Sequence, residues 1–238
     1  MKYDFNMINN GPTIVFLHGW GVNRKIYNRI IDLIKFDCNY INIDLYGFGE
    51  SSEPKDYFDV YEYAYQIFLL LKRCGIKRVI LVGHSYGGRL SIILSSIFDI
   101  EIYRLVLTSS AGIVRFNLLT WLRVKTYKLC KYLYMHKIIS RKFLDRFGSS
   151  DYNNATALMR RILSRVIRQD LRYLLKYISC ETLLVWNKKD KDTPYWICKK
   201  LNKGIKKSLV VDYENGGHFT AFVNYNKFSK VLKHLCKN

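Results

Sequence analysis

The chain has 238 residues, 49% of them apolar and 24% charged, with 14 glycines and 3 prolines. That length fits one α/β domain with a small insertion, and the composition excludes collagen-like, low-complexity and wholly disordered chains. The net charge is +20, and 15 basic residues against three acidic ones fall between Arg115 and Lys176, so one segment holds most of the excess. No apolar run approaches the roughly 20 residues that span a bilayer.

The amino-terminal residues and the cysteines bear on the cellular location of the protein, and residues 2–8 also predict an edge strand. They lack a charged region followed by an apolar stretch and a small-residue cleavage site, so we expect no secretory signal. The six cysteines are scattered without a Cys-x-x-Cys pair. We therefore expect no zinc site, and reduced thiols in a cytoplasmic protein. Residues 2–8 alternate weakly between apolar and polar, which predicts an antiparallel edge strand.

Short runs rich in Val, Ile and Leu recur along the rest of the chain. Their apolar residues are consecutive, which is typical of strands buried on both faces of a parallel sheet. The predicted strands are residues 13–17, 40–45, 78–82, 104–108, 182–186 and 208–212. Apolar residues at helical spacing predict helices at 24–36, 60–72, 87–97, 195–202 and 221–235. The alternation predicts an α/β fold with a mostly parallel, doubly wound sheet flanked by helices.

The alternation stops between residues 115 and 178, where the pattern is helical only. We therefore expect an α/β core formed by 1–114 and 179–238, with a helical cap or lid at 115–178 inserted between the fifth and sixth strands. The apolar residues of this insertion either line an acyl site or simply pack onto the core.

Arginines recur at three- and four-residue spacing along one predicted helix of the insertion: Arg160, Arg161, Arg165, Arg168 and Arg172. Such a stripe predicts weak association with an anionic membrane surface or an acidic substrate. A solvated basic face is the alternative. The basic residues carry no recognised nucleic-acid motif, so we expect no nucleic acid partner.

The clearest chemical motif follows the strand at 78–82. Gly83-His84-Ser85-Tyr86-Gly87 is a G-x-S-x-G sequence placed between a buried strand and an amphipathic helix. A sharp turn there lifts the serine hydroxyl clear of the sheet, and the flanking glycines allow backbone segments to approach closely. The helix start also aims N–H groups at the site. The motif predicts a nucleophile elbow with Ser85 as the nucleophile.

A second motif, His18-Gly19-Trp20-Gly21, directly follows the strand at 13–17. A serine that attacks a carbonyl carbon needs hydrogen-bond donors for the oxyanion that develops. The backbone N–H of Tyr86, next to the nucleophile, is one donor, and the loop after this strand supplies the other. We predict Trp20 as the second donor of the oxyanion hole; a tight strand–helix turn is the alternative.

The remaining partners of a serine nucleophile lie far along the chain. Asp190 stands a few residues beyond the penultimate predicted strand, where a carboxylate can orient a histidine, and Asp192 is its competitor. His218 lies between the last strand and the last helix, and we predict it as the base. His18 and His84 belong to the turns already described, where we expect structural hydrogen bonds.

With these motifs in order, the sequence resembles the α/β-hydrolase fold superfamily, in its esterase, lipase and C–C hydrolase branch. The motifs are HGWG at 18–21, DLYGFGES at 44–51, GHSYGG at 83–88, a strand followed by Asp190 and Pro194, and GGHF at 216–219. The order Ser85, Asp190, His218 is that of the triad on this scaffold. The sequence departs at Asn187 and Glu181, where such proteins usually carry Gly and Pro.

The resemblance implies a serine hydrolase that cleaves carboxylic esters of small or medium acyl groups through an acyl-enzyme. Relatives that are dehalogenases or epoxide hydrolases carry Asp where this chain has Ser85, and dienelactone hydrolases carry Cys. No metal or organic cofactor is implied. Alternatives are the same triad used for C–C bond hydrolysis, amide or iminopeptide hydrolysis or acyl transfer, and a slow-turnover module that binds and signals a small molecule.

Overall fold

The computed structural model describes residues 1–114, 118–144 and 150–237. Contacts divide the chain into two compact units, Met1–Ile113 with Gln169–Asn238, and Val114–Arg168. The insertion was expected to end at residue 178, but 169–178 group with the sheet unit. The backbone N–H of Leu171 donates to the carbonyl of Gly112 at 2.8 Å, and the side chains of Leu174 and Leu175 are buried.

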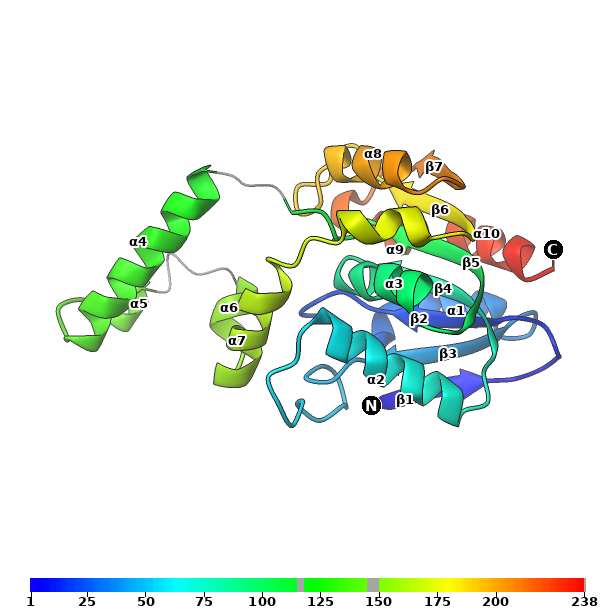
Figure 1. Ribbon diagram of the computed structural model, residues 1–238, viewed down its shortest axis with the longest axis horizontal. Coiled ribbons are helices and arrows are strands. Elements are labelled where there is room, and N and C mark those ends of the chain that lie inside the picture. Colours follow the sequence, from blue (N-terminus) through cyan, green and yellow to red (C-terminus); the bar gives the residue numbers. More distant parts are fainter. Residues whose placement is uncertain (115–117, 145–149, 238) are drawn as a thin grey trace. The chain divides into compact units, whose positions relative to one another are not determined.

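The sheet unit contains, among the described residues, a seven-stranded sheet in the order β1-β3-β2-β4-β5-β6-β7 (Figure 1). Its strands are β1 Lys2–Asn6, β2 Thr13–Leu17, β3 Asn39–Asp44, β4 Arg78–His84, β5 Glu101–Thr108, β6 Glu181–Trp186 and β7 Ser208–Asp212. Neighbouring strands from β3 to β7 pair parallel, and β1 pairs antiparallel with β3. The predicted mostly parallel sheet and its antiparallel edge strand are confirmed.

Helices cover both faces of this sheet. They are η1 Arg24–Tyr27, α1 Asn28–Ile34, α2 Val60–Arg73, α3 Tyr86–Ile97, η2 Arg172–Tyr177, α8 Tyr195–Gly204, η3 Gly217–Phe219, α9 Thr220–Val223 and α10 Tyr225–Lys237. α2 begins where its sequence predicts, because Asp59 accepts from the Glu62 N–H and the Glu62 carboxylate accepts from the Asp59 N–H, a capping box. The helix expected at 221–235 is two helices that meet at Asn224.

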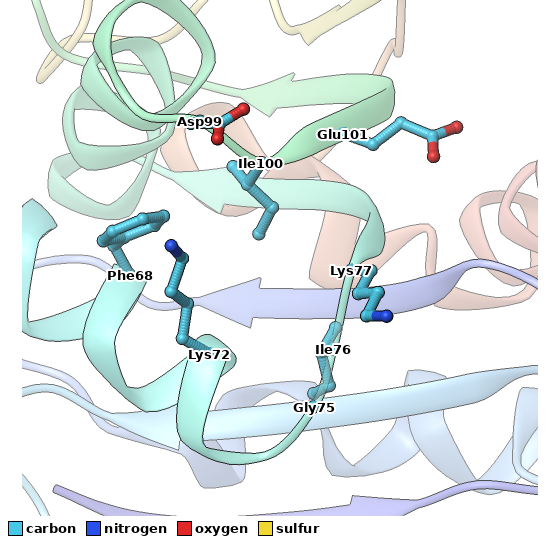
Figure 2. Close-up of a pocket in the computed structure, with 8 residues that line it drawn as sticks. All are labelled: Phe68, Lys72, Gly75, Ile76, Lys77, Asp99, Ile100 and Glu101. Atoms are coloured by element: carbon cyan, nitrogen blue, oxygen red, sulfur yellow. The ribbon is translucent and has the colours of Figure 1, made fainter.

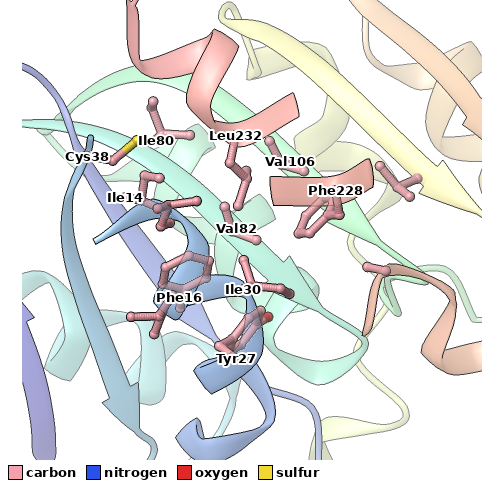
Figure 3. Close-up of a cluster of buried hydrophobic side chains, with 14 of the residues drawn as sticks. Ile14, Phe16, Tyr27, Ile30, Cys38, Ile80, Val82, Val106, Phe228 and Leu232 are labelled. Atoms are coloured by element: carbon pink, nitrogen blue, oxygen red, sulfur yellow. The ribbon is translucent and has the colours of Figure 1, made fainter. Parts of the chain in front are cut away.

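One face of the sheet is covered by α1 and α10, which pack against each other. Strand residues such as Phe16 and Ile80 meet Ile30 of α1 and Phe228 and Leu232 of α10 in a continuous apolar cluster (Figure 3). On the other side, α2 packs on α3, α3 contacts β2, β4 and β5, and α8 packs on η2. Each fully buried aliphatic or aromatic side chain contributes about 1.5–3 kcal/mol, so the two layers hold the central strands rigidly.

The second unit is helical in its described residues, as the sequence predicts. It contains α4 Leu118–Met135, α5 Arg141–Leu144, α6 Ser150–Asn154 and α7 Ala157–Val166. Within it the rings of Tyr127 and Tyr152 lie 5.4 Å apart, and Arg160 donates to the backbone oxygens of Tyr152 and Asn153. Among the described residues, we find no helix whose length and hydropathy would suit it to span a bilayer.

The arginine stripe does not follow one helix, and this expectation is wrong. α7 ends at Val166, so Arg160, Arg161 and Arg165 lie on it, whereas Arg168 lies beyond it and Arg172 begins η2. The break arises because Asp170 accepts from the backbone N–H and the guanidinium of Arg172, which starts a new turn.

Candidate active site

The candidate site lies at the carboxyl edge of the central strands. β2 has β3 on one side and β4 on the other, so the connection from β2 to β3 and the connection from β3 to β4 run in opposite directions across the sheet. Such a switch point opens a crevice outside the carboxyl ends of the strands. Leu17 pairs with Gly83, and His84 with Thr108, so the residues that follow β2, β4 and β5 leave the sheet at the same level.

Ser85 stands in a strained turn between β4 and α3. Its backbone has φ +50° and ψ −109°, a conformation that costs a non-glycine residue about 1–3 kcal/mol. Its N–H donates to the carbonyl of Thr108 at 3.1 Å, and its carbonyl accepts from the N–H of Ala111 at 2.9 Å. The chain after β5 therefore holds the turn from one side. The Ser85 residue is half-buried, which leaves it open to solvent at this edge.

The glycines of the elbow are required by close contacts. A Cβ at Gly83 would overlap Ser91 and the backbone of α3. A Cβ at Gly87 would overlap the carbonyl of Leu17, at the end of β2. The G-x-S-x-G spacing therefore lets α3 start directly against two neighbouring strands.

The loop after β2 lies beside Ser85. A Cβ built on Gly19 would stand 3.3 Å from the Cβ of Ser85, and the rings of Trp20 and Tyr86 are 5.3 Å apart. His18 anchors this loop, because its Nε2 accepts from the N–H of Leu45 at 3.1 Å and its Nδ1 donates to the carbonyl of Gly19 at 2.7 Å. The two residues expected to donate to an oxyanion are thus neighbours next to Ser85.

Asp190 and His218 are brought together although 28 residues separate them. Nδ1 of His218 lies 3.0 Å from Oδ2 and 3.2 Å from Oδ1 of Asp190. A carboxylate only accepts, so Nδ1 carries the proton and Nε2 is free to accept one. Burial by itself would raise the pKa of Asp190, but hydrogen bonds from His218 and from the N–H of Thr193 outweigh it and hold that pKa below its usual value.

Asp192, the competing carboxylate, does not take this position. Its side chain is exposed, and its backbone N–H donates to Oδ1 of Asp190 at 2.9 Å. Asp190, Asp192 and His218 are also the one group of at least three metal-capable side chains in the described parts of the chain, with ligand atoms within 4.8 Å. Because Asp190 and His218 are hydrogen-bonded to each other, we interpret the group as an acid–base pair.

The structure forms a hydrogen bond between Asp190 and His218 but, in the described parts of the chain, none between His218 and Ser85. The imidazole of His84, the residue before Ser85, lies 4.8 Å from that of His218, centre to centre. His218 therefore contacts the residue that precedes Ser85, and catalytic hydrogen bonds can be long in the absence of substrate and tighten when it binds.

Two residues at this site were not assigned from the sequence. The hydroxyl of Thr193 lies 2.8 Å from Oδ2 of Asp190 and 3.2 Å from Nδ1 of His218. Asn187 donates to the carbonyl of Tyr213 at 2.5 Å and accepts from the N–H of Lys189 at 2.8 Å. Asn187 thus joins the ends of β6 and β7 at the position where relatives usually carry Gly. The spacing Asp-x-x-Thr, typical of an Asx turn, was the available signal for Thr193.

A pocket of 410 Å³ lies away from the candidate site at Ser85 (Figure 2). It is lined by Phe68 and Lys72 of α2, by residues 75–77 and by residues 99–101. These segments precede β4 and β5, so the pocket lies at the amino edge of the sheet, opposite to Ser85. Ligands of open α/β sheets bind at the carboxyl edge, and we do not assign this pocket to the reaction.

Comparisons with known proteins show which families and structures this chain is similar to. A family model described as alpha/beta hydrolase fold matches residues 12–124, and another, described as TAP-like protein, matches residues 173–231. The AB hydrolase superfamily protein YisY of Bacillus subtilis is 24% identical over 94% of this chain and 91% of its own length. The pimeloyl-(acyl-carrier protein) methyl ester esterase of Wigglesworthia glossinidia brevipalpis is 26% identical over 98% of this chain and 97% of its own. A solved esterase from Exiguobacterium antarcticum superposes with a TM-score of 0.77 at 20% identity, covering 99% of this chain and 96% of that one.

Proposed function

The chain belongs to the α/β-hydrolase fold superfamily of enzymes, and on this premise we propose that it is a serine hydrolase of carboxylic esters with small or medium acyl groups. The hydrogen bond between Asp190 and His218, beside the elbow that carries Ser85, is the observation that supports this most. The similar proteins include two esterases and the enol-lactonase from Burkholderia xenovorans. An ester carbonyl is the substrate group they share.

In the proposed reaction, Ser85 Oγ attacks the ester carbonyl carbon while Nε2 of His218 takes its proton. His218 then gives that proton to the leaving alcohol, and water activated by the same imidazole releases the acyl group from Ser85. Asp190 keeps the proton on Nδ1 and stabilises the imidazolium that forms. The backbone N–H groups of Trp20 and Tyr86 hold the oxyanion.

The test of this proposal is the hydrolysis of p-nitrophenyl acetate and butyrate by the wild type and by Ser85→Ala. We expect Ser85→Ala to lower kcat/KM by about 10⁴–10⁶-fold, because the acyl-enzyme cannot form. Ser95→Ala is the matched control: Ser95 lies on α3, the helix that follows Ser85, and is half-buried with its hydroxyl bonded to the carbonyl of Ser91. Equal rates for Ser85→Ala and the wild type would refute the proposal.

Two further measurements separate the alternatives. Labelling by a fluorophosphonate probe, absent in Ser85→Ala, distinguishes an enzyme with an activated serine from a module that only binds a small molecule. A panel of esters, amides and thioesters then distinguishes ester hydrolysis from amide hydrolysis and acyl transfer, which use the same groups. The association of the basic insertion with anionic membranes stays a prediction, which vesicle sedimentation at two lipid charges tests.

A further inference from the structure

Thr193 lies where the candidate acid, the candidate base and strand β5 meet. Its side chain is buried, with 5% of the residue exposed. The hydroxyl is 2.8 Å from Oδ2 of Asp190, 3.0 Å from the carbonyl of Ser109 and 3.2 Å from Nδ1 of His218. The backbone N–H of Thr193 also donates to Oδ1 of Asp190 at 2.9 Å. One residue therefore contacts both oxygens of the carboxylate.

The donors around Asp190 fix the orientation of its carboxylate. Oδ1 accepts the N–H groups of Asp192 and Thr193, and Oδ2 faces the Thr193 hydroxyl and Nδ1–H of His218. The first two donors are backbone groups of the loop itself. The Thr193 hydroxyl is the donor that keeps Oδ2 turned towards His218, and it also helps to lower the pKa of Asp190.

The same hydroxyl lies close to the segment after β5 that holds the nucleophile. Ser109, whose carbonyl faces Thr193, follows β5 directly and is fully buried, with φ +44°. Two residues further on, the N–H of Ala111 donates to the carbonyl of Ser85. The one hydrogen of the Thr193 hydroxyl goes to Oδ2 of Asp190 at 2.8 Å, so the Ser109 carbonyl at 3.0 Å is a close contact that places Thr193 beside the end of β5.

We propose that Thr193 is a positioning residue, whose hydroxyl donates its one hydrogen to Oδ2 of Asp190 and so holds that oxygen against Nδ1 of His218. The inference rests on the proposed function, because it concerns the acid and base of that reaction. Reacting groups lose rate steeply when their geometry loosens by even 1 Å. Thr193 therefore contributes to kcat without touching the substrate.

The test compares Thr193→Val, which keeps the shape and removes the hydroxyl, with Thr193→Ser, which keeps the hydroxyl. We expect Thr193→Val to lower kcat for p-nitrophenyl butyrate about 10–100-fold with KM nearly unchanged, the size of effect that loss of an outer hydrogen-bond partner has elsewhere. Thr193→Ser should restore most of kcat. Thr193→Ala is measured beside Thr193→Val, so that a folding defect in one leaves the comparison intact.

Thr182→Val is the matched control, since Thr182 is also buried but lies near the amino end of β6, away from the site. It should leave kcat unchanged. A second readout is the proton NMR resonance of Nδ1–H of His218, which should shift or broaden in Thr193→Val and persist in Thr193→Ser and Thr182→Val. This signal needs no turnover, so it reports on Thr193 even if Ser85→Ala shows the proposed function to be wrong. A wild-type kcat and resonance in Thr193→Val, or an equal loss in Thr193→Ser, would overturn the inference.

Discussion

His18 and His84 flank the nucleophile as neutral, fully enclosed side chains. Burial lowers the pKa of His18 to about 4, and burial together with the nearby His218 lowers that of His84 to about 3. Nδ1 of His84 donates to the carbonyl of Thr108 at 3.1 Å, and His18 anchors the loop that carries Trp20. Both histidines form the structural hydrogen bonds that the sequence predicts for them, although His84 is the last residue of β4 and not part of a turn.

These two residues make the stability of the fold dependent on pH. Between pH 6.5 and about 4 the unfolded chain takes up protons at both positions and the folded chain does not. The free energy of unfolding is therefore highest above pH 6.5 and falls as the pH falls, by about 1.4 kcal/mol per pH unit for each histidine. Urea unfolding at pH 7, 6 and 5 measures the slope, which His18→Gln should reduce. A stability that stays flat between pH 7 and 5 would contradict this expectation.

At the scale of elements, the sequence located the strands well and the helix ends less well. β2 and β7 have the predicted bounds, because the ends of an apolar run that is bounded by polar residues fix where the strand begins and ends. β5 begins three residues before its prediction, since Glu101 pairs with Arg78 of β4 in a salt bridge at 2.9 Å that the apolar pattern does not reveal. The ends of strands and helices depend on contacts with residues that are distant in the chain, so the local sequence pattern does not predict them.

The junction of β2, β4 and α3 depends on Gly87. Gly87→Ala would push the start of α3 away from the carbonyl of Leu17, which misplaces Ser85 and the loop after β2 together. We expect a loss of about 1–3 kcal/mol in unfolding free energy, typical of overpacking, and a loss of at least about 100-fold in kcat/KM. Urea unfolding and ester hydrolysis measure the two effects.

Gly75→Ala is the control for this variant. Gly75 has φ +67° and no atom within 4 Å of an added Cβ, so alanine there costs about 1–2 kcal/mol of backbone strain without a clash. It precedes β4, at the edge of the sheet opposite to Ser85, and should leave kcat/KM unchanged. If both variants lose activity equally, lost stability and not the elbow geometry is the cause.

At the scale of the whole molecule, the chain consists of a sheet unit interrupted by a helical insertion. The two ends of the interruption lie together, because Leu171 donates to the carbonyl of Gly112. The sheet unit has its own apolar core and contains Ser85, Asp190 and His218. The points where the chain leaves and re-enters the sheet unit are adjacent, so a short linker could join them in place of the insertion.

Replacement of residues 114–168 by a short Gly-Ser linker tests this organisation. Closing a short loop between adjacent ends costs little entropy, so we expect one cooperative urea transition and continued fluorophosphonate labelling of Ser85. If the insertion is a lid, as the sequence analysis expects, the variant should also change its preference among acyl chain lengths. Loss of the cooperative transition would show instead that the insertion is part of the folding unit.

The sequence by itself determined the parallel sheet, its antiparallel edge and the elbow at Ser85, because apolar periodicity and the G-x-S-x-G motif are local and follow from backbone geometry. The tertiary structure decided which carboxylate meets His218. The sequence predicted Asp190 with Asp192 as a competitor, and the turn closed by Thr193 directs Asp190 inward and leaves Asp192 exposed. It also decided that Asn187 joins β6 to β7 and that residues 169–178 belong to the sheet unit. Those features depend on side chains and backbone groups that meet only after the strands have paired.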